Sequence, residues 1–501
     1  MKKCNFKRLS VLLIIFLLSL KVNGYAGVQK SVANSGKGRG RSLIISGFTD
    51  NSNIKDSVTF QVYQHYFKAA GLTNDNVFVS KVQQNNFQFK LNAITDPVYI
   101  KISFPKGNGG DNIFLAEPGD SIFMKVTGDS ISFSGIGAER FSCQQKIFAK
   151  GDVKAKRIDD FYYFLQDIRK QMDSIYEPKF EFLKSYQAKI SKSSYEILNA
   201  DLTSKKYLKM MSDIRYYFEH RNKEDDKRNI IKFYDSYTRE LAGFLNVDNG
   251  SYLTSRAYSD FLFEKERCKV LFSYWYKGRD EIFSNLYKSL KENYRGAIRE
   301  KLIVTCFLEL FQKSDNASLF LEDAVNQVHD KEYKSILQNM LATRAPGSMA
   351  YDFNLESASG EQVALKKFRG KTVIIDFWFN GCIGCINLNK VMKNVIDTFL
   401  YRDDVVFVSI NVDKDKDRWK KGILAGIYTH KESLNLFTNG LGYDHPMIYH
   451  YGYKGFPQLL IIDKEGKVLS ANPPLPFDKQ SFDKLIQLIN TYQGSYSKLT
   501  P

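Results

Sequence analysis

Residues 371–388 read K-T-V-I-I-D-F-W-F-N-G-C-I-G-C-I-N-L, and this stretch decides the fold of its part of the chain. Its first half is apolar and rich in β-branched and aromatic residues, which is typical of a buried strand. Its second half holds two cysteines, Cys382 and Cys385, separated by two residues. A C-x-x-C after a strand and at the start of a helix has the spacing of a dithiol/disulfide couple, because the first helical turn brings the two sulfurs within bonding reach.

The position of Cys382 predicts an acidic thiol. The strand would deliver this residue to the end of a sheet and the start of a helix, where unpaired backbone N–H groups and the helix dipole stabilise negative charge. We therefore expect Cys382 to be an exposed nucleophile with a pKa below the usual ~8.5. Cys385, one turn further into the helix, would resolve the mixed disulfide that Cys382 forms with a partner.

Asp376 interrupts the apolar run where a buried strand should carry no charge. Burial of an unpaired carboxylate is costly, so its pKa should be raised towards neutrality. We expect it to accept a proton from Cys385. The alternative is an ordinary aspartate at a strand end whose carboxylate reaches solvent.

The sequence around this stretch alternates strands and helices. Strands are expected over 361–365, 371–378, 404–413, 455–463 and 466–471, and helices over 386–400 and 482–492. Such alternation predicts a three-layer α/β/α domain over residues 345–501. Pro457 stands directly before a strand, where a trans proline would fit poorly, so we expect a cis Phe456–Pro457 bond.

The N-terminal residues 1–26 combine a basic start, an apolar run over 9–20 and small residues at Gly24 and Ala26. This is the pattern of a secretory signal peptide, and an uncleaved N-terminal membrane anchor is the alternative. We therefore expect an exported protein, periplasmic or held to the membrane by this segment. Disulfides persist in such compartments.

The remaining sequence divides into three regions. Residues 27–42 are polar and glycine-rich, and a flexible leader is expected there. Short alternating segments over 43–140 predict a small β-sandwich, and apolar residues at helical spacing over 141–344 predict an all-α region. Three further cysteines are interpreted as small buried hydrophobes: Cys143, Cys268 and Cys306.

Composition narrows the function classes. The 501 residues exceed what one hydrophobic core usually serves, and six cysteines are too few for a disulfide-stapled scaffold. The formal net charge is +17, but the excess is spread through lysine-rich segments. A solvated basic surface is therefore the preferred interpretation, and nucleic acid is not expected as a partner.

Other uses of a C-x-x-C can be compared with the sequence. A structural zinc site needs four ligands, and His445 and His450 are the nearest pair, far downstream. Covalent haem attachment needs a histidine after Cys385, where Ile386 stands. A peroxidase of the peroxiredoxin type would have threonine where Phe379 stands. We therefore expect no bound metal and no cofactor.

The region from 345 to 493 resembles the thioredoxin-fold domain of the TlpA/ResA-like thiol–disulfide oxidoreductases. The resemblance rests on the stretch quoted above, on V-V-F-V-S-I-N-V-D-K-D and on G-F-P-Q-L-L-I-I-D-K-E-G-K-V. It implies a nucleophile, a resolving cysteine and a buried acid, in that order: Cys382, Cys385 and Asp376. It also implies a substrate-docking edge beside them, formed by Phe456, Pro457 and Trp378, with Pro457 as the cis proline.

The resemblance implies an exported oxidoreductase that reduces protein disulfides, with a membrane redox protein as electron donor. Cytochrome c maturation is one role of this kind. Two departures stand out: Gly381 replaces a frequent tryptophan, and Gly384 a frequent proline. Two alternatives stay open, a partner-binding protein with a structural thioredoxin domain and a Cu(I)-handling protein, because two thiolates bind Cu(I) readily.

Overall fold

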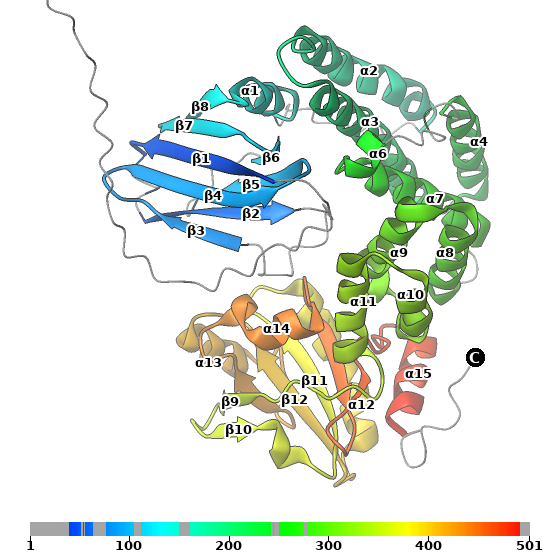
Figure 1. Cartoon of the computed structure of the whole chain (residues 1–501). Coiled ribbons are helices and arrows are strands. Elements are labelled where there is room, and N and C mark those ends of the chain that lie inside the picture. The colour runs from blue at the N-terminus through cyan, green and yellow to red at the C-terminus, as the bar shows by residue number, and fades with distance from the viewer. Residues whose placement is uncertain are drawn as a thin grey trace, which may run out of the picture.

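The computed structural model describes residues 40–51, 54, 56–63, 77–104, 112–149, 161–241, 244, 250–274 and 279–490. Two β-sheets, a curved row of helices and a mixed α/β part follow one another along the chain (Figure 1). The predicted fold class, a β-sandwich, an all-α region and a C-terminal α/β fold, is thus confirmed. The expected signal peptide (1–26) and nearly all of the expected leader lie outside the described residues.

The N-terminal part is built from two four-stranded sheets, ordered β4-β1-β7-β8 and β3-β2-β5-β6. The strands are β1 (Arg41–Thr49), β2 (Ser57–Tyr63), β3 (Val77–Lys81), β4 (Asn86–Ile94), β5 (Val98–Ser103), β6 (Ile113–Ala116), β7 (Ser121–Thr127) and β8 (Ser130–Ile136). Every second residue of β4 and β7 is buried over most of their length, as a half-exposed strand requires. Phe60 of one sheet stacks on Phe89 of the other with ring centroids 4.7 Å apart, so the two sheets share one core.

The middle part is helical. Its longer helices are α1 (Ala138–Ile147), α2 (Phe161–Ser185), α3 (Lys192–His220), α4 (Glu224–Glu240), α7 (Tyr258–Tyr274), α8 (Arg279–Asn293), α9 (Gly296–Leu310) and α11 (Lys331–Arg344). Shorter pieces are α6 (Gly250–Thr254), α10 (Leu321–Gln327) and the 3₁₀ turns η2 (Phe311–Lys313) and η3 (Ala317–Phe320). Cys143, Cys268 and Cys306 are buried free thiols, so their interpretation as small buried hydrophobes is confirmed. Among the described residues no helix is long and apolar enough to cross a membrane.

A buried carboxylate links the sandwich to the helices. The hydroxyl of Tyr99 on β5 donates to Asp201 Oδ2 on α3 at 2.7 Å. Ser255 donates to the other oxygen at 2.7 Å, and Arg256 Nε lies 3.8 Å from Oδ2. These groups are almost fully buried, so the contact fixes how the two parts meet.

The C-terminal part is a seven-stranded sheet in the order β10-β9-β13-β12-β11-β14-β15. Its strands are β9 (Asn354–Ser357), β10 (Gln362–Ala364), β11 (Thr372–Trp378), β12 (Val405–Asn411), β13 (Leu434–Phe437), β14 (Gln458–Ile462) and β15 (Val468–Ser470). Its helices are α12 (Ile383–Phe399), α13 (Lys416–Ala425), α14 (Pro446–Tyr451) and α15 (Lys479–Asn490). One face packs on α12 and α15 and the other on α14, which gives the three predicted layers.

The last helices of the middle part pack on the C-terminal part, as Figure 1 shows beside α11. Gln312 donates to the carbonyl oxygen of Gly452 at 2.6 Å. Asn472 donates to the carbonyls of Phe311 and Ser314, both at 3.0 Å. The segment that follows α9, which contains η2, is therefore hydrogen-bonded to two loops of the α/β part.

Candidate active site

Strand β11 delivers the cysteine pair to the edge where the parallel strands end. The chain leaves β11 at Trp378, turns through Gly381 with a φ of +96°, and enters α12. Cys382 is the N-cap of this helix, and the backbone N–H of Cys385 points at its sulfur over 3.0 Å. A φ in this range strongly favours glycine, so Gly381 suits this turn.

Cys382 and Cys385 are joined by a disulfide, with Cα atoms 5.2 Å apart. Each cysteine is only 4% exposed, whereas Ile383 between them is 74% exposed. The expectation of an exposed Cys382 is therefore wrong for this disulfide-bonded form. Its sulfur lies 3.8 Å from the carbonyl oxygen of Phe456, and it is packed in one cluster with Trp378, among others.

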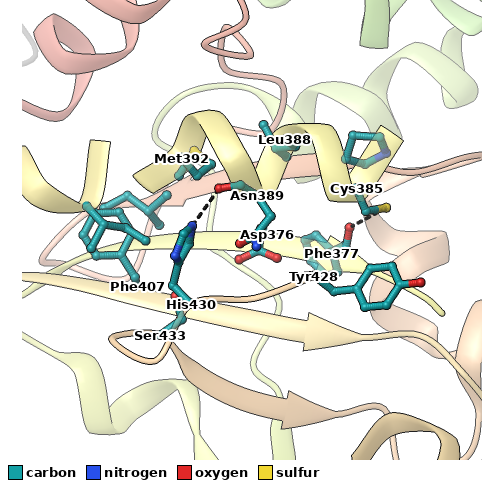
Figure 2. A pocket seen from close by; sticks show the side chains of 13 residues that line it. Asp376, Phe377, Cys385, Leu388, Asn389, Met392, Phe407, Tyr428, His430 and Ser433 are labelled. Atoms are coloured by element: carbon teal, nitrogen blue, oxygen red, sulfur yellow. Dashed lines mark hydrogen bonds between the residues drawn. The ribbon is translucent and has the colours of Figure 1, made fainter. Parts of the chain in front are cut away.

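Asp376 lies on β11 beneath α12, between Cys385 and His430 (Figure 2). Ser409 on β12 donates a hydrogen bond to its Oδ2 at 2.9 Å. Burial raises the pKa of Asp376 to about 7, and the Ser409 hydrogen bond opposes this rise. Part of the Asp376 side chain is accessible, but it faces only a narrow pocket. Burial therefore remains the main influence on its pKa.

This pocket joins Asp376 to the disulfide. Asp376, Cys385, Pro457, Tyr428 and His430 all line it. It leaves about 10 Å³ for the centre of a water molecule, which is enough for about one water. Asp376 and Cys385 thus border the same small space. His430 closes the other end, with its Nε2 at 2.7 Å from the carbonyl oxygen of Asn389.

The Phe456–Pro457 peptide bond is cis, as expected from the sequence. Pro457 packs directly on the first turn of α12. A Cβ on Gly384 would lie 2.8 Å from Pro457 Cδ, closer than real Cβ contacts come. Gly384 thus allows the helix to approach the proline, and this explains a departure that the sequence left unexplained.

Replacing Gly384 with alanine is expected to destabilise the protein. The added methyl must push α12 away from the rigid Pro457 ring, which should cost about 2–3 kcal/mol, the upper part of the overpacking range. The better helix propensity of alanine returns about 1 kcal/mol, so the net loss should be about 1–2 kcal/mol. Urea unfolding of the oxidised protein measures the difference. Gly455→Ala is the matched control, because nothing lies within 4 Å of that position, and it should be neutral. Equal stability of the two variants would contradict this account of Gly384.

The surface beside the disulfide is aromatic. The rings of Phe456 and Tyr443 are 5.0 Å apart, and Phe379 lies 5.9 Å from Tyr443 and 6.3 Å from Phe456. Phe456 and Pro457 are partly exposed, so they can meet a substrate. Trp378 is fully buried and stacks on Tyr428, so its predicted place at the docking edge is wrong.

The loop before Cys382 is held by residues that the sequence analysis did not find. Asn380 donates from its backbone and side chain to Asp413 at 3.0 and 2.7 Å. Arg418 on α13 donates to the carbonyl of Asn380 at 2.7 Å, and Gly381 donates to the hydroxyl of Tyr428 at 2.9 Å. These residues are far apart in the sequence and follow no motif, so only the three-dimensional structure brings them together.

The predicted resolving cysteine, acid and docking proline therefore line one pocket: Cys385, Asp376 and Pro457. Cys382 and Phe456 do not line it, but they pack in one cluster with Cys385 and Trp378. Among the described residues, no group of three or more histidine, cysteine and acidic side chains could hold a metal ion. His445 caps α14, with its Nδ1 3.2 Å from the backbone nitrogen of Met447, and it is buried. The expectation for the catalytic roles stays a prediction.

The fold and this site define a thioredoxin-like domain. Its disulfide lies at the N-terminus of α12, one of the helices that cover the sheet. Residues 370–468 match the family model of thioredoxin-like proteins. The thioredoxin-like protein YneN of Bacillus subtilis (strain 168) is 25% identical over 140 residues, which are 28% of this chain and 78% of that protein. The thiol-disulfide oxidoreductase ResA of the same organism is 27% identical over 126 residues, 25% of this chain and 65% of that protein.

Solved structures are similar over the same share of the chain. The thioredoxin domain of a thiol-disulfide oxidoreductase from Bacteroides vulgatus is 23% identical, with a TM-score of 0.26. The match covers 30% of this chain and 99% of that one. The family match lies wholly within the C-terminal part, which is similar in sequence to the thiol-disulfide oxidoreductase ResA.

Proposed function

We propose that this protein is an exported thiol–disulfide oxidoreductase that reduces disulfides in other proteins. The observation that carries the proposal is the disulfide at the start of α12, where the N–H of Cys385 faces the sulfur of Cys382. A sulfur in this place is stabilised as a thiolate by the N–H group and by the helix dipole. The thiolate is the form that attacks disulfides.

In the proposed reaction the reduced protein starts with a Cys382 thiolate and a Cys385 thiol. Cys382 attacks one sulfur of the substrate disulfide, forms a mixed disulfide and releases the first substrate thiolate, which takes a proton from water. Cys385 then loses its proton and attacks Cys382, which forms the protein's own disulfide and releases the second thiolate. Two electrons pass to the substrate, and the described disulfide is the oxidised product.

Asp376 is the proposed acceptor of the Cys385 proton. A pKa near 7 allows the carboxyl to take and return a proton at neutral pH. Both groups line the same narrow pocket, which has room for about one water, and such a water would carry the proton between them. The oxidised protein must then be reduced again, and we propose a membrane redox protein as the donor of these two electrons.

The docking edge is proposed to be Phe456 and Pro457. The carbonyl oxygen of Phe456 lies 3.8 Å from the Cys382 sulfur. A substrate chain that lies along this segment would therefore bring its own sulfur close to Cys382. Rings of Phe379 and Tyr443 extend the surface. Substrates with apolar residues next to their cysteine are therefore expected to react faster than charged ones.

The test is the reduction potential of the Cys382–Cys385 couple. The free thiols of the mature protein are counted in glutathione and dithiothreitol buffers of different redox potential. A Cys382→Ser/Cys385→Ser variant gives the background from the three buried thiols. A potential near ~−270 mV supports a reductase, and one near ~−120 mV indicates an oxidant. If Cys382 and Cys385 never interconvert between dithiol and disulfide, the oxidoreductase proposal fails, and a partner-binding protein becomes the better account. N-terminal sequencing of the exported chain tests cleavage after residue 26.

A further inference from the structure

A second cavity lies between the helical region and the thioredoxin-like domain. Its volume is about 480 Å³, within the usual range of about 300–1,000 Å³ for small-molecule sites. The end of α9 and η2 line one side, and the segment 452–458 lines the other. Phe307, Leu308 and Phe311 give the cavity apolar walls, while Gln312 and Gln458 add polar groups.

The charges in this cavity are unbalanced. Lys313, Arg344 and Lys454 line it together with one acid, Glu309. Burial lowers the pKa of Lys454, which the charges of Arg344 and Lys313 lower further, while Glu309 opposes the change. Lys454 donates to the carbonyl oxygen of Leu308 at 3.2 Å rather than to a carboxylate. The cavity therefore carries an excess of positive charge.

Arg344, the last residue of α11, is the most confined of these cations. Arg344 is only 6% exposed, and its Nε is buried without a hydrogen-bond partner. Within the described part of the chain its side chain makes no ion pair. The guanidinium lies 5.8 Å from the centroid of the Phe311 ring and close to Tyr453. Burial lowers the pKa of Arg344 to about 10. A buried guanidinium without an anion is costly to the folded state.

The backbone opposite Arg344 is shaped for this guanidinium. Gly452 ends α14 with a φ of +62°, and a Cβ there would lie 2.6 Å from Arg344 Cζ. Any other residue at 452 would displace the guanidinium. Glycine at position 452 therefore allows the left-handed turn and also leaves room for the Arg344 guanidinium.

We propose that this cavity binds a small organic anion, with its carboxylate or phosphate on Arg344 and Lys454 and its apolar part against Phe307 and Phe311. Guanidinium groups bind such anions through two parallel hydrogen bonds, and the anion would cancel the excess charge. The site does not depend on the disulfide. However, its wall is the segment that carries Phe456 and Pro457, so a bound anion would hold the docking edge in place.

Isothermal titration calorimetry of the mature, oxidised protein tests the proposal, with phenyl phosphate and citrate as anions and phenol as the neutral probe. We expect saturable binding of phenyl phosphate, at most weak binding of phenol, and binding roughly ten- to a hundredfold weaker in Arg344→Gln, the usual effect of losing a hydrogen bond to a charged group. Lys431→Gln is the control, because Lys431 is 90% exposed and lies outside the cavity; it should bind like the wild type.

Three results would overturn the proposal: no saturable binding of either anion, equal binding in Arg344→Gln, or the same loss in Lys431→Gln, which would indicate attraction to a basic surface alone. If Arg344→Gln does not fold, a Lys313→Gln/Lys454→Gln variant gives the same test. The Cys382→Ser/Cys385→Ser variant should still bind the anion. Failure of this site thus leaves the redox proposal untouched, and the reverse also holds.

Discussion

A Cys385→Ser variant of the reduced protein is expected to accumulate mixed disulfides with its substrates, whereas Cys382→Ser should lose disulfide exchange altogether. Without Cys385, the intermediate on Cys382 has no internal thiol to resolve it. Without Cys382, the remaining thiol is one turn inside α12, buried and 4.0 Å from the carbonyl oxygen of Phe377. Its exchange rate should fall to that of an ordinary buried thiol.

Non-reducing electrophoresis of both variants with a disulfide-containing substrate separates the two outcomes. The covalent complex should disappear on addition of dithiothreitol. Cys143→Ser is the matched control, since burial raises the pKa of that thiol to about 12 and its removal should change neither result. A trapped complex with Cys382→Ser, and none with Cys385→Ser, would reverse the two assigned roles.

Replacing Asp376 with asparagine is expected to stabilise the oxidised protein at pH 8 and to slow the resolving step. The raised pKa means that the folded state holds a proton that the unfolded state has lost between about pH 4 and 7. The stability of the wild type therefore falls as pH rises through this window and stays low above it. A tenfold change in proton affinity is about 1.4 kcal/mol, so the cost at pH 8 is up to about 4 kcal/mol.

Asparagine carries no charge at any pH, so the gain should appear at pH 8 and vanish near pH 4. Trp378 and Trp419 both lie in this domain, so their fluorescence follows its urea unfolding. Asp483→Asn, at an exposed site, is the control and should leave the profile unchanged. Resolution of mixed disulfides should slow by about 10²-fold. A pH-independent gain, or none, would exclude the buried-acid role.

The redox motif and its surroundings could be predicted because they are local. The apolar run of β11 and the amphipathic pattern of α12 are long and regular, and the C-x-x-C lies at their junction. Shorter elements escaped the same reasoning. Strands β9 and β13 have four residues each, which is too short for periodicity or an apolar run to mark them.

The errors at the site concern contacts between distant segments. Alternation along β11 puts Trp378 on the same face as Asp376, but it does not show that Tyr428 covers that face. Cys382 is buried because Phe456, about seventy residues downstream, lies against it. The anion cavity has the same origin, since its cations come from α11, η2 and the loop after α14.

The pairing of β9 with β13 matters for any attempt to produce the thioredoxin-like domain alone. The family match starts at residue 370, yet β9 and β10 precede it and complete the sheet beyond β13. A recombinant fragment cut at 370 would lose Phe353 and Leu355 from the core and expose β13 as a bare edge. Such edges recruit other chains, so this fragment should aggregate. One that begins near residue 345 keeps the edge covered and is the better choice for crystallisation or NMR.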